Sequence, residues 1–374
     1  MFPTQFTGAS FTWERKKLGI YVPITMGQSP NSKNYTNNPR DNILVQGNAD
    51  LYNNRVLKRT FTTEVTKIAD RNDILIISVR APVGDIARNQ YESVVIGRGI
   101  ASIKGNDFLY YQLEKMNNSG FWKKYIAGST FESITGKDLK SSDIYISNHK
   151  EEKSIGDIFQ TLTKTIQLHE RKCEELALIK KALLQKLFPK KDEVRPEVRY
   201  KNFSDVWEQR KLGEVIISEH KGKVKSIMKG GNTNYLETNY LNGGTAQKVD
   251  ALADVSKDDV LILWDGSKAG TIYHGFEGAL GSTLKAYVPK YSGDFLYQIL
   301  KKNQDKIYQS YRTPNIPHVI KNFTEKFNVS IPTIIEQQEI GDFFKQLDSL
   351  ITLHQRKLEK LKQLKKFLLQ NMFI

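Results

Sequence analysis

The sequence predicts an α/β (α+β) fold: two mixed α/β domains, related by a pseudo-twofold axis, are separated by two long helices that form an antiparallel intramolecular coiled coil. The first observation behind this prediction is a repeat, because residues 155–188 align without a gap on residues 340–373 and share 18 of 34 positions. The second is that residues 13–19 return at 207–213. A period of this length has the size of a whole domain rather than of a solenoid or propeller unit.

The repeats divide the 374 residues into four predicted segments. These are a first domain at 1–148, a first helix at 149–190, a linker with the second domain at 191–333, and a second helix at 334–374. The helices retain sequence identity while the domains diverge, which suits one structural task for the helices and two recognition tasks for the domains. Divergence of surface loops without a functional cause is the alternative explanation.

Each domain is predicted to contain β-strands beneath variable loops. Gly84 and Gly270 follow matching runs, 73–77 and 259–263, at equal spacing, which predicts a tight turn in both copies. Loops that differ on a common scaffold are where specificity usually resides. Runs rich in β-branched and aromatic residues predict strands at 74–79, 93–96, 100–103, 260–264 and 283–288, and short helical patterns lie at 108–116 and 295–302.

Both repeated segments have the heptad pattern of a coiled coil. Apolar residues recur in alternating steps of four and three, and charged residues fill the outer positions. Pro189 ends the first helix, because proline cannot continue the hydrogen-bond ladder. His169 and His354 occupy equivalent positions near the helix midpoints, so antiparallel pairing could bring them together. The predicted seam comprises Ile155, Phe159, Leu162, Ile166, His169, Leu176 and Leu183, and Ile340, Phe344, Leu347, Ile351, His354, Leu358, Leu361 and Leu368.

The composition favours a nucleic-acid partner. Lys and Arg number 56 against 41 Asp and Glu, a formal net charge of +15, and release of counterions from phosphates drives the binding of such basic proteins. Cys173 is the only cysteine, which excludes an internal disulfide and a Cys-rich zinc site. The sequence shows no signal-peptide pattern and no long apolar stretch, so we expect a soluble, cytoplasmic protein without a membrane partner.

Polar loop residues in both domains are candidate DNA contacts. Asn and Gln suit adenine, whereas Arg and Lys suit guanine or phosphate. Each residue taken singly also fits a solvated surface group, and the matched Trp13 and Trp207 fit packing anchors better than base-stacking platforms. The candidates are Gln28, Ser29, Asn31, Lys33, Asn34, Ser78, Arg80, Arg98, Ser129 and Lys137 in the first domain, and Lys223, Lys225, Lys229, Asn232, Asn234, Ser267, Lys268, Arg312, Asn315 and His318 in the second.

No motif for catalysis is found. The sequence lacks a GxxxxGK[ST] phosphate loop and an HExxH metal pair, and Gly97-Arg98-Gly99 lacks the rest of a dinucleotide-binding fingerprint. It also lacks the Asp/Asn-Pro-Pro-aromatic signature of adenine methyltransferases and any recognisable Ser-His-Asp or paired-carboxylate arrangement. We therefore predict no catalytic residue, no cofactor site and no metal site in this chain.

Taken together, these features resemble the specificity subunit of type I restriction–modification systems over essentially the full length of the chain. The resemblance rests on the Trp-Glu-x-x-x-Leu-Gly blocks at Trp13 and Trp207 and on the Gly-Gln-Ser-Pro turn that begins at Gly27. The sharpest motif is Pro332 followed by Glu-Gln-Gln-Glu-Ile at 336–340. Ser147 replaces this proline in the first copy, and the second domain has no clear Gly-x-Ser/Thr-Pro turn.

The resemblance implies a non-catalytic subunit with two target recognition domains, each of which reads half of a bipartite sequence in the major groove of double-stranded DNA. The helices would fix the spacer and dock two methyltransferase (modification) subunits, which carry S-adenosylmethionine and methylate adenine. Restriction/translocase subunits would use ATP and Mg to translocate DNA and to cut it when the site is unmodified. All of these cofactors would belong to the partner subunits.

Two alternatives stay open at the level of sequence. One is a non-catalytic bivalent scaffold, which binds RNA or acts as an architectural protein without bipartite sequence specificity. The other is an enzyme whose active site leaves no recognisable motif. Selection from random duplexes tests the first alternative, and an assay of the purified chain for methyl transfer or DNA cleavage tests the second.

Overall fold

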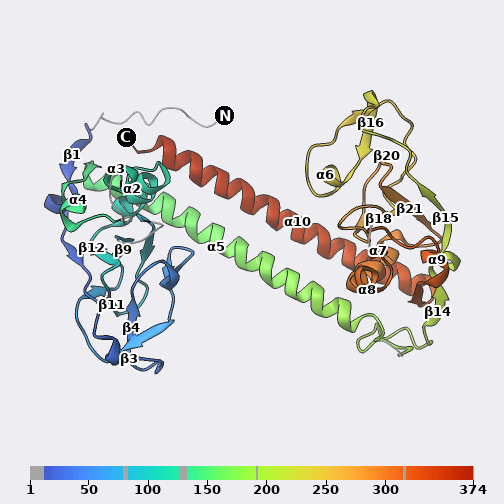
Figure 1. Ribbon diagram of the computed structural model, residues 1–374, viewed down its shortest axis with the longest axis horizontal. Helices are drawn as coiled ribbons and strands as arrows, with labels where there is room; N and C mark the ends of the chain where they lie inside the picture. Colours follow the sequence, from blue (N-terminus) through green and yellow to red (C-terminus); the bar gives the residue numbers. More distant parts are fainter. Residues whose placement is uncertain (1–11, 79–82, 127–132, 191–192, 315–316, 374) are drawn as a thin grey trace. The chain divides into compact units, whose positions relative to one another are not determined.

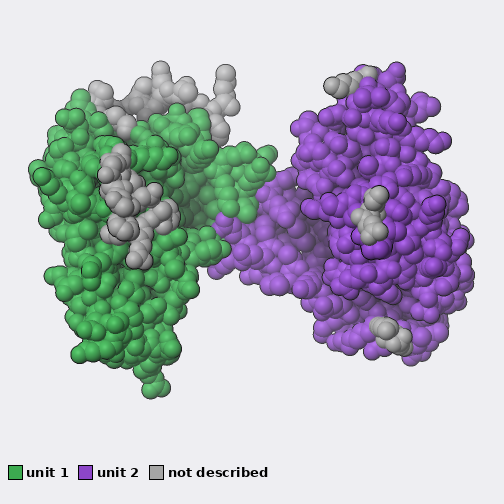
Figure 2. All heavy atoms as spheres, in the orientation of Figure 1, with its two compact units in different colours: residues 1–168, 357–374 green, residues 169–356 purple. Residues whose placement is uncertain are grey.

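The described chain forms two compact units, each of which contains a globular domain and the ends of both long helices (Figure 2). Unit 1 comprises residues 1–168 and 357–374, and unit 2 comprises residues 169–356. The structure is a computed structural model, and it describes residues 12–78, 83–126, 133–190, 193–314 and 317–373.

Unit 1 is built on a six-stranded sheet with the order β2-β12-β9-β10-β6-β5. Figure 1 labels two of its strands, β9 and β12, and helix α2. All four residues of β9 are buried, as expected for a strand that is covered on both faces. Helix α2 packs an apolar face into the same core and begins where the side chain of Asn106 accepts a hydrogen bond from the amide of Leu109. The bounds are β2 (Ile24–Met26), β5 (Leu51–Tyr52), β6 (Arg55–Val56), β9 (Ile74–Ile77), β10 (Ile86–Arg88), β12 (Ile100–Ile103) and α2 (Asp107–Asn118).

A second, five-stranded sheet with the order β3-β7-β4-β11-β8 completes the domain of unit 1. A separate antiparallel pair, β1 and β13, joins the start of the domain to the segment before the first long helix. The bounds are β1 (Glu14–Lys17), β3 (Tyr35–Thr36), β4 (Asn42–Val45), β7 (Thr60–Thr62), β8 (Ile68–Asp70), β11 (Ser93–Ile96) and β13 (Asp143–Ile146), with helices α1 (Leu18–Tyr21), α3 (Lys123–Ile126) and α4 (Gly136–Ser141).

Unit 2 repeats the central sheet of unit 1 and differs in the second sheet. The order β15-β21-β18-β19 matches β2-β12-β9-β10 strand for strand, and α7 takes the place of α2. The second sheet has three strands, ordered β17-β16-β20, and β14 pairs with β22 as β1 does with β13. The bounds are β14 (Glu208–Lys211), β15 (Ile216–Lys221), β16 (Lys229–Leu236), β17 (Lys248–Val249), β18 (Val260–Leu263), β19 (Ile272–His274), β20 (Ala279–Leu280), β21 (Leu284–Pro289) and β22 (Asn328–Ile331), with helices α6 (Thr238–Leu241), α7 (Gly293–Lys302), α8 (Gln304–Ser310) and α9 (Phe323–Lys326).

The two long helices, α5 (His149–Lys186) and α10 (Ile334–Asn371), each contain 38 residues. Within unit 2 they run antiparallel, because Lys180 of α5 pairs with Asp348 of α10 while His169 lies beside His354. The Nδ1 atoms of the two histidines are 2.9 Å apart, so the duplicated seam brings equivalent residues together. Every residue of the predicted seam is buried or half-buried.

Each unit contains an aromatic cluster to which both long helices contribute. One ring lies near the start of one helix, and another lies just past the end of the other helix. In unit 2, Phe344 lies near the start of α10, and Phe188, just past the end of α5, packs on it at 6.0 Å between ring centroids. In unit 1, Phe159 near the start of α5 meets Phe373, just past the end of α10, at 5.6 Å. The remaining members are Trp207 and Phe295 in unit 2, and Trp13 and Phe108 in unit 1. The reciprocal ends explain why the two helix sequences match so closely.

The predicted fold class is confirmed, and the differences are local. Helix α5 ends three residues before Pro189, and the turn glycines Gly84 and Gly270 have positive φ of 94° and 96°. Trp13 and Trp207 are packing anchors, as predicted. In the second sheets, β11 was predicted at 93–96, whereas β4, β16 and the two- and three-residue strands were not. Two- and three-residue strands are too short to show an alternating pattern. Among the described residues, no helix is both long and apolar enough to cross a membrane.

Candidate nucleic-acid interface

The predicted loop of unit 1, residues 28–34, is a polar segment held in place by side-chain contacts. Gly27 starts it, and a Cβ at this position would lie only 2.1 Å from the carbonyl oxygen of Gly97, so only glycine allows this approach. The Glu64 carboxylate accepts hydrogen bonds from the amide of Asn31, at 2.7 Å, and from the side chain of Asn34, at 2.6 Å. These bonds hold the pKa of Glu64 below its ordinary value. Gln28, Asn31 and Lys33 are exposed.

Several other candidates of unit 1 gather around the turn between β11 and β12. Arg98 is exposed on this turn, and its amide donates to the hydroxyl of Ser29 at 3.1 Å. Ser78 is fully buried and donates to the carbonyl of Arg98, so it supports the turn from below rather than facing solvent. Lys137 is exposed at the start of α4, beside the end of β2, where a Cβ on Gly136 would meet the side chain of Met26.

In unit 2, the equivalent loop consists of residues 222–228 between β15 and β16. Gly222 corresponds to Gly27, because its amide donates to Leu284 as that of Gly27 does to Ile100, and a Cβ would lie 2.1 Å from a backbone oxygen here too. The sequence did not reveal this match, since the Ser-Pro that follows Gly27 is absent. Lys223 and Lys225 are exposed on the loop, and neither forms an ion pair with a residue that the structure describes.

Two further groups of candidates lie elsewhere in unit 2. Ser267 and Lys268 are exposed on the turn after β18, and the guanidinium of Arg312 donates to the Ser267 carbonyl at 3.1 Å. His318 reaches the same turn through its bridge to Asp265. Asn232 and Asn234, by contrast, line a cavity of about 560 Å³ together with Tyr240, Lys257 and Phe276.

The structure leaves some predicted residues unplaced and adds others. Arg80, Ser129 and Asn315 lie outside the described residues, as does the side chain of Lys229. The added residues are Ile227 and Met228, whose side chains are 81% and 40% exposed on the basic loop of unit 2. Their aliphatic character is visible in the sequence, but their exposure depends on a turn that the sequence pattern does not predict.

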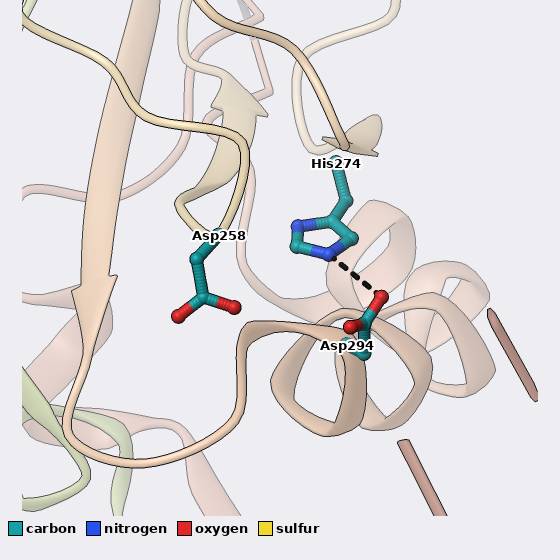
Figure 3. Close-up of side chains that lie close together, drawn as sticks. All are labelled: Asp258, His274 and Asp294. Carbon is teal, nitrogen blue, oxygen red and sulfur yellow. Dashed lines mark hydrogen bonds and ion pairs between the residues drawn. The ribbon is translucent and has the colours of Figure 1, made fainter. Parts of the chain in front are cut away.

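A polar junction in unit 2 brings His274 of β19 and Asp294 of α7 together beside Asp258 (Figure 3). Nδ1 of His274 donates to the carbonyl of Asp259, at 3.0 Å, and Nε2 lies 3.1 Å from the carboxylate of Asp294. The second oxygen of Asp294 accepts from Lys345 of α10 at 2.9 Å, and Asp258 accepts from the amide of Gly293. Burial alone would raise the pKa of Asp294, but the hydrogen bonds from His274 and Lys345 outweigh it and lower this pKa.

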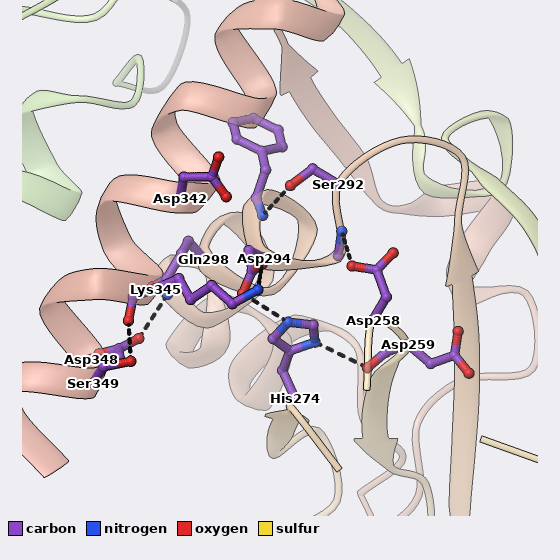
Figure 4. A network of polar contacts seen from close by, with 12 residues as sticks. Asp258, Asp259, His274, Ser292, Asp294, Gln298, Asp342, Lys345, Asp348 and Ser349 are labelled. Atoms are coloured by element: carbon purple, nitrogen blue, oxygen red, sulfur yellow. Dashed lines mark hydrogen bonds and ion pairs between the residues drawn. The ribbon is translucent and has the colours of Figure 1, made fainter. Parts of the chain in front are cut away.

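Ligand atoms of Asp258, His274 and Asp294 lie within 4.8 Å of one another, close enough to suggest a metal site. The contacts favour a structural role, because one oxygen of Asp294 already lies beside the His274 imidazole and the other accepts from the Lys345 ammonium (Figure 4). A Lys345 ammonium at this distance would repel a divalent cation. The junction therefore serves to hold strand β19, helix α7 and helix α10 together.

Unit 1 contains the same junction with different residues. Arg88 stands in the place of His274 and pairs with Asp107 at 2.7 Å, and Gln160 of α5 donates to the other Asp107 oxygen at 2.8 Å. Gln160 and Lys345 occupy the same position in the helix repeat. The junction adjoins a cavity of about 580 Å³ that is lined by polar residues, including Arg55 and Lys164. Each globular domain is thus tied to the start of one long helix at one matched point.

Comparison with known proteins identifies similar sequences and a similar fold. The family model described as the type I restriction modification DNA specificity domain matches residues 11–178 and again residues 204–363. The chain is 34% identical over 195 residues to the putative type I restriction enzyme MjaX specificity subunit of Methanocaldococcus jannaschii, and 31% identical over 178 residues to the MjaVIII specificity subunit of the same organism. These alignments cover 49% and 45% of the chain but only 44% and 42% of the relatives' lengths.

A solved structure has the same fold over the whole chain. The type I restriction–modification system S subunit from M. genitalium superimposes with a TM-score of 0.75 and covers 100% of this chain and 99% of its own. Its sequence is only 18% identical, so this likeness concerns the fold.

Proposed function

Because the chain belongs to the family of type I restriction–modification DNA specificity domains and contains two of them, we propose that it is the sequence-specific DNA-recognition subunit of a type I restriction–modification complex. Each unit would read one half of a bipartite target in double-stranded DNA. The observation that carries the proposal is the matched pair of loops, 28–34 and 222–228, which start at equivalent glycines on one scaffold but present different side chains.

The chemistry of the loops supports DNA as the ligand. Loop 28–34 exposes an amide, Gln28, and a cation, Lys33, next to Arg98, and such groups form hydrogen bonds with base edges and phosphates. Loop 222–228 exposes two lysines that lack ionic partners among the described residues. The formal charge of +15 adds a favourable, salt-dependent attraction to phosphates.

The proposal assigns the chemistry of the complex to other chains. We infer that methyltransferase and restriction/translocase subunits bind to this chain, and that S-adenosylmethionine, ATP and Mg belong to those subunits. The long helices are the expected docking surface for the methyltransferase subunits, because their outer positions stay exposed along most of α5 and α10. In this assignment the chain supplies recognition and assembly and has no catalytic residue of its own.

Selection of binding sites tests the proposal. The full chain, alone and with its methyltransferase partner, would be incubated with random duplexes and the bound DNA sequenced. We expect two short motifs separated by a fixed number of variable base pairs. Bound duplexes that share no motif would contradict the proposal and favour a general nucleic-acid scaffold. Retention of single-stranded RNA as strong as that of duplex DNA would do the same. Methyl transfer or cleavage by the purified chain alone would contradict its non-catalytic assignment.

A further inference from the structure

The basic loop of unit 2 ends in a β-turn that is held at both ends. The amide of Met228 donates to the carbonyl of Lys225 at 3.0 Å, which closes the turn, and the carbonyl of Met228 accepts from the amide of Asp250 at 3.1 Å. On the other side, Val224 is buried and its backbone bonds to Leu280 and Ser282. The tip is therefore a positioned structure rather than a free loop.

The tip presents aliphatic side chains to solvent. Ile227 occupies the third position of the turn, where polar residues and glycine are usual, and its side chain is 81% exposed. Met228 follows it and is 40% exposed. Leu252, two residues beyond the Asp250 that bonds to Met228, is 91% exposed. Burial of these groups in the chain would have been favourable, so their position needs an explanation.

Two lysines share the loop with the aliphatic tip. Lys223 and Lys225 are both exposed. An apolar protein partner would not require these cations, whereas a DNA groove offers phosphates at its edges and apolar groups on its floor. The only apolar group that a base pair presents in the major groove is the 5-methyl of thymine.

We propose that the tip of loop 222–228 enters the major groove and that Ile227 contacts a thymine methyl group while Lys223 and Lys225 bind the flanking phosphates. This inference rests on the proposed function and adds to it a chemical class of base for the half-site read by unit 2. The corresponding loop of unit 1 carries no exposed aliphatic side chain among residues 28–34, so the contact is specific to one half of the target.

Replacement of thymine by deoxyuracil tests the inference, because it removes only the methyl group. Binding of the full chain to its selected duplex would be measured by fluorescence anisotropy, with deoxyuracil substituted at one thymine at a time. We expect at least one position in one half-site at which the substitution weakens binding about fourfold. This change in affinity corresponds to the free energy of burying one methyl group. Ile227→Asn should bind the thymine and deoxyuracil duplexes equally.

Two variants serve as controls. Ile217→Asn makes the same chemical change at a 68% exposed isoleucine of β15 outside the loop, and it should retain the thymine preference. Lys225→Gln should weaken binding to both duplexes alike and lower the salt slope by about one, again with the preference intact. Unchanged thermal unfolding of Ile227→Asn would show that this exposed change leaves the fold intact.

The outcomes separate the inference from the function on which it rests. A thymine preference that persists in Ile227→Asn, or a selected duplex in which no deoxyuracil substitution weakens binding, would overturn the inference while the bipartite motif stands. Failure to select paired motifs at a fixed spacing would instead overturn the proposed function, and the inference with it.

Discussion

The polar junctions of the two units occupy the same place and use different chemistry. In unit 1, Arg88 pairs with Asp107, which Gln160 also contacts. In unit 2, His274 pairs with Asp294, which Lys345 also contacts. A strand, a short helix and a long helix meet at both points. In both units the acid of the short helix pairs with a basic side chain of the strand and accepts a hydrogen bond from the long helix. Geometry has been retained here and charge has not.

The loops at 28–34 and 222–228, which we propose to contact DNA, differ in the same manner but to a larger extent. Equivalent glycines begin them, yet loop 28–34 is fixed through Glu64 and loop 222–228 through backbone bonds around Val224. Contacts between each domain and the long helix that it adjoins have been preserved, because α5 and α10 repeat one sequence, whereas the solvent-facing loops have diverged. Substitutions at the matched contacts should therefore have parallel effects in the two units, scaled by burial.

The largest expected effect is at the reciprocal aromatic clusters. Phe188→Ala should destabilise unit 2 by about 3–5 kcal/mol, and Phe373→Ala should destabilise unit 1 by a similar amount, because each removes a buried ring. Hydrogen exchange measured by mass spectrometry would assign the loss to one unit or the other. Phe367→Ala, at a 59% exposed position of α10, is the matched control and should have little effect. Loss of protection in unit 1 rather than unit 2 on Phe188→Ala would contradict the cluster assignment.

A smaller effect is expected at the junction acids. Asp294→Asn should lower the free energy of unfolding by about 1–3 kcal/mol, because it leaves His274 and Lys345 without their carboxylate. Asp107→Asn should cost about half as much, since Asp107 is the more exposed acid and Arg88 keeps its bonds to the carbonyls of Asn72 and Gly105. Chemical denaturation of both variants measures the difference. A larger loss for Asp107→Asn than for Asp294→Asn would show that burial of the acid does not determine the size of the loss.

Acid should weaken unit 2 through the same carboxylate. The pKa of Asp294 is lower in the folded chain than its ordinary value, so the unfolded state binds a proton more readily. The resulting stabilisation is complete above about pH 4 and is lost as the pH falls through the folded-state pKa. Denaturation measured between about pH 2 and pH 6 should therefore show a steeper decline in unit 2 for the natural chain than for Asp294→Asn. Identical pH profiles would refute this linkage.

The smallest effect is expected from a substitution that makes the two junctions alike at the long helix. Lys345→Gln introduces the residue type that unit 1 has at Gln160. It should cost a few tenths of a kcal/mol at most, because Lys345 is exposed and solvent screens its ion pair with Asp294. Thermal unfolding would detect a larger change. A cost equal to that of Asp294→Asn would show that the lysine, rather than the histidine, is the main partner of the acid.

The sequence predicted the features that repetition encodes. Matched heptads predicted α5 and α10, and the equivalent histidines at 169 and 354 indeed lie side by side. Matched tryptophans predicted packing anchors, since two surface residues seldom retain a tryptophan by chance. The central strands β9 and β18 were found because each is a run of buried aliphatic residues.

Features outside the repeat were harder to predict from the sequence. Apart from β11, the strands of the second sheets were not predicted, because most have two to four residues and their pairing is set by long-range contacts. Ser78 was expected to face DNA, but it lies in the core beneath the Arg98 turn. The junctions were not predicted either, because Arg88, Asp107 and Gln160 are far apart in sequence and meet only when a strand and two helices have packed.

The most direct test of the central claim is an exchange of one domain. Residues 12–148 would be replaced by the corresponding segment of another member of the family, and the bound sequences of the full chimaeric chain would be selected from random duplexes and compared with those of the natural chain. We predict that one half of the bipartite motif changes and the other half is retained. A change in both halves, or in neither, would contradict the assignment of one half-site to each unit.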